Sequence, residues 1–181
     1  MKAHFFTILL ITAVLISPVS AVKGPGGGST APVLTEIEAQ NLLFLREEEK
    51  LARDVYLAML DLYNAQIFAN ISVSEQRHMD AVKSLIDKYK LQDPVADNTP
   101  GAFTNTTLAS LYESLIEKGS KSFKDALEVG VIIEEMDIHD IEVEMLPFTT
   151  KTDIKQVLTN LLAGSYNHLD AFNKNLAAQA N

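Results

Sequence analysis

Apolar residues recur along most of this chain at steps of three and four, the spacing that places side chains on one face of an α-helix. Four long segments show the pattern, at about 36–64, 66–90, 121–146 and 152–177. A shorter amphipathic segment, LASLYESLIEKG, ends at Gly119. No stretch alternates apolar and polar residues for long enough to predict a β-strand. The pattern therefore predicts an all-α fold.

The connections between these segments differ in length. Short turns join the first segment to the second and the third to the fourth, whereas LQDPVADNTPGAFTNTT and the short helix separate the second from the third. Two hairpins joined by one long crossover are typical of a four-helix bundle. Thr35-x-x-Glu38 is a capping-box start, and Pro147 ends the third helix. We expect the folded domain to cover residues 35–178.

The first 34 residues differ in composition from the rest. Lys2 precedes the apolar run 5–16, and a small-x-small cleavage site follows, which predicts a secretory signal peptide over residues 1–21. The run is shorter than the ~20 residues of a spanning helix, and an uncleaved membrane anchor is the alternative. Residues 22–34 read as a flexible Gly/Pro/Ser linker. We expect an exported protein, extracellular or in the cell envelope, that is free of the membrane after cleavage.

The composition limits the kinds of partner and metal site that are possible. The chain has 181 residues, 47% of them hydrophobic and 22% charged, and a formal charge of −9. This negative charge argues against nucleic acid and anionic membranes as partners. The absence of cysteine excludes disulfides, thiolate zinc sites and iron–sulfur clusters. Any bound metal must be held by oxygen and nitrogen.

Polar residues interrupt each of the four apolar stripes near its middle. The interruptions are Glu49, Glu75 with His78, Glu134, and Ser165 with His168. Buried charges are normally paired or bound to metal. Each residue alone also has an ordinary explanation: Glu75 could close a capping box with Ser72, and His168 could be a hydrogen-bonded core histidine.

The interruptions also match in depth. Glu49, His78, Glu134 and His168 lie eleven to sixteen residues from the turn of their hairpin. At ~1.5 Å per residue they can share one level of a bundle. Glu75 and His78, three residues apart, share a face. A pair of divalent cations is the simplest way to neutralise carboxylates gathered in a dry layer, and inward-facing Glu-x-x-His motifs are typical of dinuclear carboxylate bundles.

Several motifs resemble the ferritin-like superfamily. EKLARDVY resembles the first helix of rubrerythrins and ferritins, SEQRH the second helix, and ALEVGVIIEE the third helix of ferritins. Residues 36–177 also resemble an uncharacterised ferritin-like family, domain of unknown function 2202, with which they share LLFLREEEKLARDVY, SEQRHM, GAF, IEEMDIHDIE and GSYNHLDAF. The fold expected is a ferritin-like four-helix bundle with a short extra helix in the crossover.

The resemblance implies roles for individual residues. The implied metal ligands are Glu49 and Glu134 as terminal or bridging carboxylates, Glu75 as a bridge, and His78 and His168 as terminal nitrogens, with Tyr56 as a hydrogen-bonding neighbour at the catalytic centre. The fourth helix departs from the family pattern, because Gly164 and Ser165 stand where a carboxylate is usual. Asp137, one turn after Glu134, could supply the missing oxygen or could be a solvated helix residue.

The resemblance implies a non-haem di-iron oxidoreductase acting on oxygen, peroxide or ferrous iron. Without a cysteine-ligated iron domain, the electron donor would be external. The reduced number of carboxylates leaves a single iron or a mixed pair open, with manganese or zinc as further candidates. Two alternatives are an exported metal-binding module without turnover and a structural bundle whose polar layer fixes helix register. An oligomer is compatible with each of these.

Overall fold

The computed structural model describes residues 33–179. The signal peptide predicted at 1–21 and nearly all of the linker predicted at 22–34 lie outside the described residues. Within residues 33–179 every regular element is helical and there is no strand, so the predicted all-α fold is confirmed. The main helices are α1 (Glu36–Tyr63), α2 (Gln66–Tyr89), α3 (Thr106–Gly119), α4 (Phe123–His139) and α5 (Thr152–Gln179). None of the helices described here is long and apolar enough to cross a membrane.

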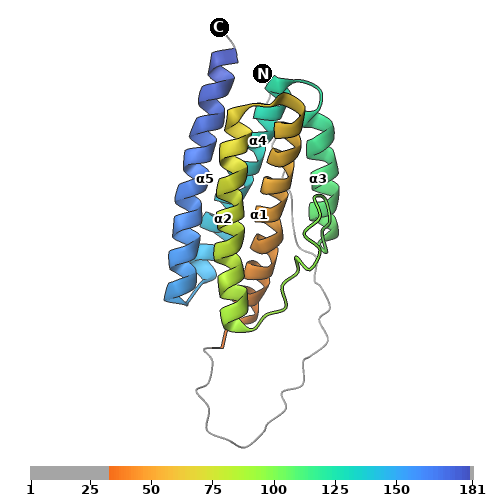
Figure 1. Cartoon of the computed structure of the whole chain (residues 1–181). Coiled ribbons are helices and arrows are strands. Elements are labelled where there is room, and N and C mark those ends of the chain that lie inside the picture. The colour runs from red at the N-terminus through yellow and green to blue at the C-terminus, as the bar shows by residue number, and fades with distance from the viewer. Residues whose placement is uncertain (1–32, 180–181) are drawn as a thin grey trace, which may run out of the picture. The chain divides into compact units, whose positions relative to one another are not determined.

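The four long helices lie lengthwise beside one another (Figure 1). α1 packs on α2 and α4 packs on α5, as the short turns require, and the two pairs meet through α1–α4 and α2–α5 contacts. The short helix α3 lies on the outside, against α1 and α4. The long crossover thus brings α4 next to α1.

Local chemistry explains where most helices begin and end. Thr35 accepts a hydrogen bond from the Glu38 amide while the Glu38 side chain returns to the Thr35 amide, a complete capping box. α1 and α2 each end one residue before the predicted boundary, because Asn64 (φ 48°) and Lys90 (φ 58°) adopt the left-handed conformation that stops a helix. Asn105 caps α3, so that helix starts two residues before the predicted segment.

The third long helix is not the single α-helix predicted at 121–146. α4 starts at Phe123, with Ser122 as its N-cap, and ends at His139. The chain then continues as a π-helical segment, η1 (Asp140–Met145), and a short 3₁₀ turn, η2 (Leu146–Phe148). Pro147 has no amide proton to donate to a carbonyl one turn earlier, so a regular α-helix cannot continue through it.

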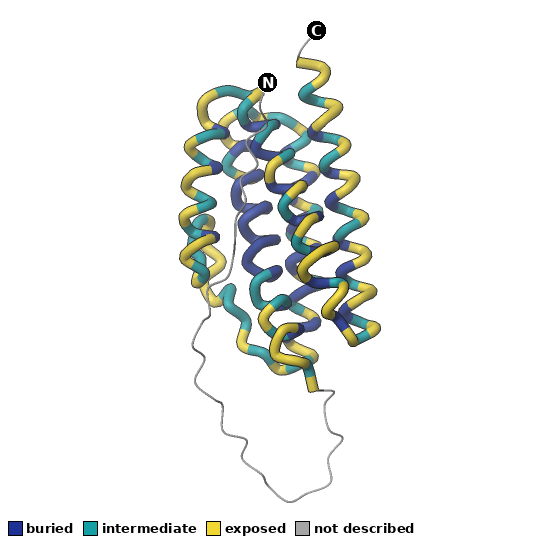
Figure 2. Tube along the Cα trace, turned by 180° about the vertical axis from the view of Figure 1, so that it is seen from behind, coloured by how far each residue is buried: buried dark blue, intermediate teal, exposed yellow. Residues whose placement is uncertain are grey.

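Helix α1 is buried on all sides over residues 45–56. Figure 2 shows this stretch as an uninterrupted dark blue coil in the middle of the helices. Its outer face is covered by the crossover: Lys50 Nζ donates to Asp54 Oδ2 at 2.5 Å and to the Thr99 carbonyl at 2.8 Å. Glu47 accepts hydrogen bonds from the Thr104 amide and hydroxyl. Glu47, Lys50 and Asp54 are therefore buried in paired form rather than solvated.

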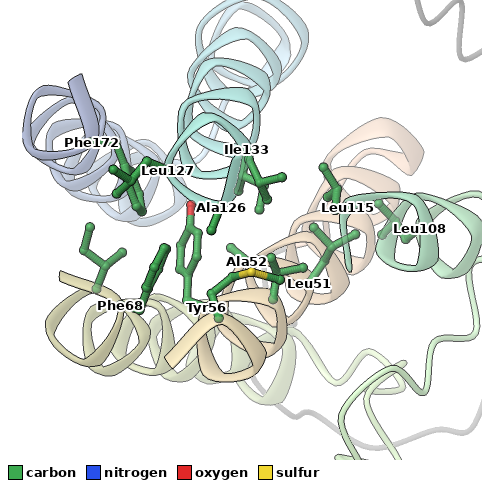
Figure 3. Packing of buried hydrophobic residues seen from close by; sticks show 14 residues of the cluster. Leu51, Ala52, Tyr56, Phe68, Leu108, Leu115, Ala126, Leu127, Ile133 and Phe172 are labelled. Atoms are coloured by element: carbon green, nitrogen blue, oxygen red, sulfur yellow. The ribbon is translucent and has the colours of Figure 1, made fainter. Parts of the chain in front are cut away.

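Two clusters of buried apolar side chains fill the interior. Tyr56, Phe68 and Phe172 belong to the first cluster, which Figure 3 shows between α1, α2, α4 and α5. The second cluster consists of Leu42, Leu45, Val82, Leu85, Ile86, Ile141, Met145, Ile154, Leu158 and Leu161. On α2 and α5 the buried polar residues lie between the residues that each helix contributes to the two clusters, and Glu49 of α1 and Glu134 of α4 lie in the same layer. The interior is thus apolar at both ends, with a polar layer between them.

Candidate metal centre

Glu75 and His78 form the middle of the polar layer. Both lie on the inward face of α2, three residues apart, and both are buried. The Nδ1 atom of His78 lies 2.8 Å from Glu75 Oε2 and 3.2 Å from Glu49 Oε2 of α1. The first hairpin therefore brings two carboxylates to one imidazole nitrogen.

The second hairpin supplies a matching group on the other side of Glu75. His168 Nδ1, from α5, lies 2.8 Å from Glu75 Oε1 and 3.4 Å from Glu134 Oε2 of α4. The two imidazole rings are stacked, with their centroids 5.6 Å apart and an angle of 27° between their planes. The two oxygens of Glu75 thus face two different histidines.

Two sets of three ligands result. Glu49, Glu75 and His78 offer ligand atoms that all lie within 4.8 Å of one another, and so do Glu75, Glu134 and His168. Glu75 belongs to both sets. Five of the six metal ligands expected from sequence are therefore brought together in an arrangement that suits two cations bridged by one carboxylate.

Asp137 lies beside these sets without belonging to either. It is buried, and its Oδ2 accepts a short hydrogen bond from the hydroxyl of Ser165. Its other oxygen, Oδ1, has no hydrogen-bond partner. The structure thus places Asp137 away from solvent, with Ser165 holding one oxygen and the other oxygen free for a ligand.

Tyr56 connects the polar layer to the first apolar cluster. Its ring contacts Phe68 and Phe172, with centroids 6.3 and 5.3 Å away. The ring extends from α1 toward α4 (Figure 3), and its hydroxyl donates to Glu134 Oε1 at 2.6 Å. Burial raises the pKa of Tyr56 well above its usual value, and the charge of Glu134 adds to the effect. Tyr56 is therefore a fixed hydrogen-bond donor that orients Glu134.

The charges of Glu75 and the two histidines stabilise one another. Burial alone would raise the pKa of Glu75, but the contacts with His168 and His78 outweigh it and lower the pKa to about 2. Burial would lower the pKa of His78, yet Glu49 and Glu75 raise it to about 11. Glu134 and Glu75 likewise overcome burial and raise the pKa of His168 to about 10. Two imidazolium groups are thus shared among the carboxylates of this layer.

The two imidazolium groups do not supply enough positive charge to balance the remaining carboxyl groups of the layer. Burial raises the pKa of Glu49 well above its usual range, and the neighbouring Asp137 adds to it. Burial also raises the pKa of Glu134 to about 8, against the opposing contact with His168, and that of Asp137 to about 7, against the Ser165 hydrogen bond. A dry layer with more carboxyl groups than imidazoles favours binding of protons or cations.

Several ligand atoms in this layer make no hydrogen bond. Glu49 Oε1, Glu75 Oε1 and Asp137 Oδ1 are buried and without a partner, and so is His168 Nδ1. His168 Nδ1 and Glu75 Oε1 are 2.8 Å apart but are not aligned as donor and acceptor. Buried polar groups are normally satisfied. Atoms that approach one another without an aligned hydrogen bond are arranged as they would be around a shared cation.

Among the buried acids that were not predicted as site residues from sequence, one also lacks hydrogen-bond partners. Glu48 lies off the apolar stripe of α1, yet it is 1% exposed and neither of its oxygens has a hydrogen-bond partner. The sequence feature that could have indicated this burial is the run EEEKLARD, in which the charged residues are not confined to one face of the helix. The stripe rule failed because it assumes that a helix is covered on one side only.

Comparisons with known proteins place the chain in a family. Residues 38–181 match the family described as "Uncharacterized protein domain (DUF2202)", and the chain belongs to that family. The uncharacterized protein MJ0754 of Methanocaldococcus jannaschii is 50% identical over 139 residues, which are 77% of this chain and 75% of that protein. The crystal structure of hypothetical protein MJ0754 from Methanococcus jannaschii has 45% identity and a TM-score of 0.80, and the match covers 90% of this chain and 88% of that one. The resemblance of this chain to domain of unknown function 2202 is thus confirmed.

Proposed function

We propose that this member of the DUF2202 family is a ferritin-like four-helix bundle that binds two metal ions and acts as a non-haem di-iron oxidoreductase on oxygen, peroxide or ferrous iron. One observation carries the proposal. Glu75 presents its two carboxylate oxygens to two histidine nitrogens, each at 2.8 Å, and belongs to both ligand sets. A carboxylate placed in this way is suited to bridge two cations.

The residues present fit such a pair. Each cation would be held by one imidazole nitrogen and two carboxylates, with Glu75 shared. Imidazole and carboxylate ligands suit iron, manganese and zinc. Bound cations would also give partners to the buried oxygens of Glu49 and Glu75 that have none, and would balance the excess of carboxyl groups. The donor set therefore supports a metal centre over a purely structural polar layer.

When bound, a pair of ferrous ions would supply the two electrons that, together with two protons from solvent, reduce hydrogen peroxide to two water molecules. The chain's own residues would orient the ligands: Tyr56 holds Glu134 by its hydrogen bond, and Ser165 holds Asp137. Groups that hydrogen-bond to metal ligands fix the orientation of those ligands and raise the affinity for the metal. The apolar clusters on both sides exclude water from the layer. With no cysteine in the chain, the reductant that restores the ferrous state would come from another molecule.

A second candidate function is metal binding without turnover. Ser165 occupies the position where a further carboxylate is expected, and its hydroxyl is engaged with Asp137. The centre then has fewer anionic ligands for ferric ions, while nitrogen and oxygen ligands bind zinc or copper more tightly than ferrous iron. A protein exported as predicted would meet these metals after translocation.

Anaerobic titration with ferrous iron tests the proposal. We expect two ions per chain in the wild type, followed by a change in near-ultraviolet absorption when oxygen or peroxide is added. His78→Ala should lose one of the two ions and Glu75→Gln should weaken both, because Glu75 belongs to both ligand sets. His139→Ala removes an exposed histidine and should behave as the wild type. Tight binding of zinc without any reaction of the iron-loaded protein would favour the second candidate, and no metal binding would contradict both.

A further inference from the structure

A chain of aromatic rings extends from the candidate metal centre to the end of α1. It begins at Tyr56, whose hydroxyl donates to Glu134 Oε1 at 2.6 Å. The Tyr56 ring lies beside that of Phe68 (Figure 3), with ring centroids 6.3 Å apart. Phe68 meets Phe123 edge to face at 6.2 Å, and Phe123 meets Tyr63 at 5.6 Å. Each step is a direct ring contact, so four rings connect the polar layer to the last residue of α1.

Tyr63 is the tyrosine at which this chain of rings comes closest to solvent. Tyr56 and Phe68 are fully buried, whereas Phe123 and Tyr63 are half-buried. The Tyr63 hydroxyl donates to the carbonyl of Gly119, the last residue of α3, at 2.7 Å. Tyr56 and Tyr63 are seven residues apart on α1, which separates their backbones by roughly 10 Å along the helix. The two phenol groups therefore connect the buried centre with one end of the bundle.

Tyrosine is the side chain of this protein that loses a single electron most readily, because the sequence contains no cysteine and no tryptophan. A phenol loses its electron together with the hydroxyl proton, whereas a phenylalanine ring has no such proton to release. The Tyr56 hydroxyl already donates to a carboxyl oxygen. Tyr63 is half-buried, so its proton can pass to water. Both phenols are thus placed for one-electron chemistry, with packed rings between them.

Peroxide reduction by a partly loaded centre lacks one electron. Conversion of hydrogen peroxide to two water molecules takes two electrons. Two ferrous ions supply both of them, but a single ferrous ion supplies only one. The two ligand sets share only Glu75, so one set can be filled before the other when metal is limiting. The second electron must then come from the protein or from an external donor.

We propose that Tyr63 supplies this second electron, which reaches the centre through Phe123, Phe68 and Tyr56. The inference rests on the proposed function, because it assigns a source of electrons to the same centre. Hydrogen peroxide gains one electron from the ferrous ion, which becomes ferric, and one from Tyr63, which becomes a neutral phenoxyl radical. The O–O bond breaks, and the proton released by Tyr63 and one proton from solvent complete two water molecules. An external reductant can then restore Tyr63 without entering the polar layer.

Radical trapping after peroxide addition tests the role of Tyr63. The protein is loaded anaerobically with one ferrous ion per chain, and bound iron is measured before hydrogen peroxide and a water-soluble nitroso spin trap are added. Electron paramagnetic resonance detects the trapped radical, and peptide mass spectrometry locates it. We expect the adduct on Tyr63 in preference to Tyr166, although Tyr166 is more exposed. Tyr63→Phe should lose this adduct, and Tyr166→Phe should keep the wild-type amount.

Tyr56→Phe distinguishes transfer along the rings from unspecific oxidation. Tyr63 is still present in this variant, but the phenol next to the centre is missing, so the Tyr63 adduct per bound iron should fall strongly. A Tyr63 adduct at the wild-type level in Tyr56→Phe would overturn the route. Labelling mainly of Tyr166 in the wild type would also overturn it, because hydroxyl radicals released into solvent attack the most accessible rings. This second comparison decides if Tyr56→Phe fails to bind iron.

The outcomes also separate this inference from the proposed function. Iron binding and peroxide reduction without any adduct on Tyr63 would refute the role of Tyr63 and leave the metal centre standing. A wild-type protein that binds no iron would contradict the proposed function itself, and the role of Tyr63 with it.

Discussion

Gly164 of α5 lies directly against the imidazole ring of His78 on α2. A Cβ atom built on Gly164 would be 2.6 Å from His78 Nε2 and 2.7 Å from Cε1. The other ring nitrogen, Nδ1, lies 2.8 Å from Glu75 and 3.2 Å from Glu49. The absence of a side chain at position 164 therefore permits His78 to occupy its place in the polar layer.

Replacing Gly164 should displace this histidine. Gly164→Ala normally gains up to about 1 kcal/mol of helix stability, but here the methyl group meets the ring. Because the ligand must move, we expect the affinity for Co²⁺ or ferrous iron to fall by about 10- to 100-fold, measured by calorimetric titration. Asn160→Ala, at an exposed position on the same helix, should leave the affinity unchanged. Equal affinities in Gly164→Ala and the wild type would show that His78 is not a ligand.

The hydrogen bond from Tyr56 to Glu134 can be removed without changing the packing of the ring. Tyr56→Phe leaves the Glu134 Oε1 atom without its 2.6 Å partner inside the protein. We expect the free energy of unfolding to fall by about 1–3 kcal/mol, measured by urea denaturation of the metal-free protein. Tyr166→Phe, which removes an exposed hydrogen bond to Glu142, should change it by less than about 0.5 kcal/mol. A similar small effect for both variants would contradict the role given to Tyr56.

Glu38 should make the stability of the protein dependent on pH. It joins the starts of α1 and α5, because Oε1 accepts from the Thr150 amide at 2.6 Å and hydroxyl at 2.8 Å, and Oε2 accepts from the Thr35 amide at 2.9 Å. Burial raises its pKa, but these hydrogen bonds outweigh it and lower the pKa to about 2.

A carboxyl group whose pKa is lowered by folding stabilises the protein fully above its unfolded pKa of 4.5. The stabilisation is then lost as the pH falls toward about 2. We expect Glu38→Gln to lower the free energy of unfolding by about 2–3 kcal/mol at pH 7. The difference in unfolding free energy between the variant and the wild type should be smaller at pH 3. Chemical denaturation at both pH values measures it. A difference that stays constant between pH 7 and pH 3 would be the contrary result.

The crossover should depend on Asp54. Asp54 accepts hydrogen bonds from Lys50 at 2.5 Å, Arg53 at 2.6 Å and the Gly101 amide at 3.1 Å. Asp54→Asn leaves two buried cations without their anion, and we expect the free energy of unfolding to fall by about 3–5 kcal/mol. Limited proteolysis should show faster cleavage within residues 90–105. Asp61→Asn, at an exposed position near the end of α1, serves as the control, and equal cleavage rates in the two variants would refute the expectation.

Much of the helical structure could be predicted from sequence because it depends on local contacts. The steps of three and four that include Leu42, Leu45 and Val82 produce one buried stripe for each helix, and caps such as Thr35 act within one turn. The polar interruptions Glu49, Glu75 and Glu134 could be found for the same reason. Their buried state follows from the stripe that they share with apolar neighbours.

Contacts between distant segments could not be predicted in this way. Lys50 and Asp54 are off the inward stripe of α1, but the crossover covers them. Glu48 is also off the stripe and buried, and the acids that act on it include Asp137 and Asp140. The π-helical segment after His139 was also missed, because the widening of a helix depends on how its end meets Pro147 and its neighbours. In both cases the contacts that determine the structure come from residues outside the same helical turn.

The amino-acid sequence alone determined the helices and the presence of acids and histidines on their inward faces, because helical periodicity is a property of neighbouring residues. Only the tertiary structure decided which of these side chains meet. The two oxygens of Glu75 face His78 and His168, from α2 and α5. Gly164 makes room for one of these rings, and Glu48 stays buried among acids. These relations depend on how four helices are rotated and shifted against one another, which is set by packing across the whole interior.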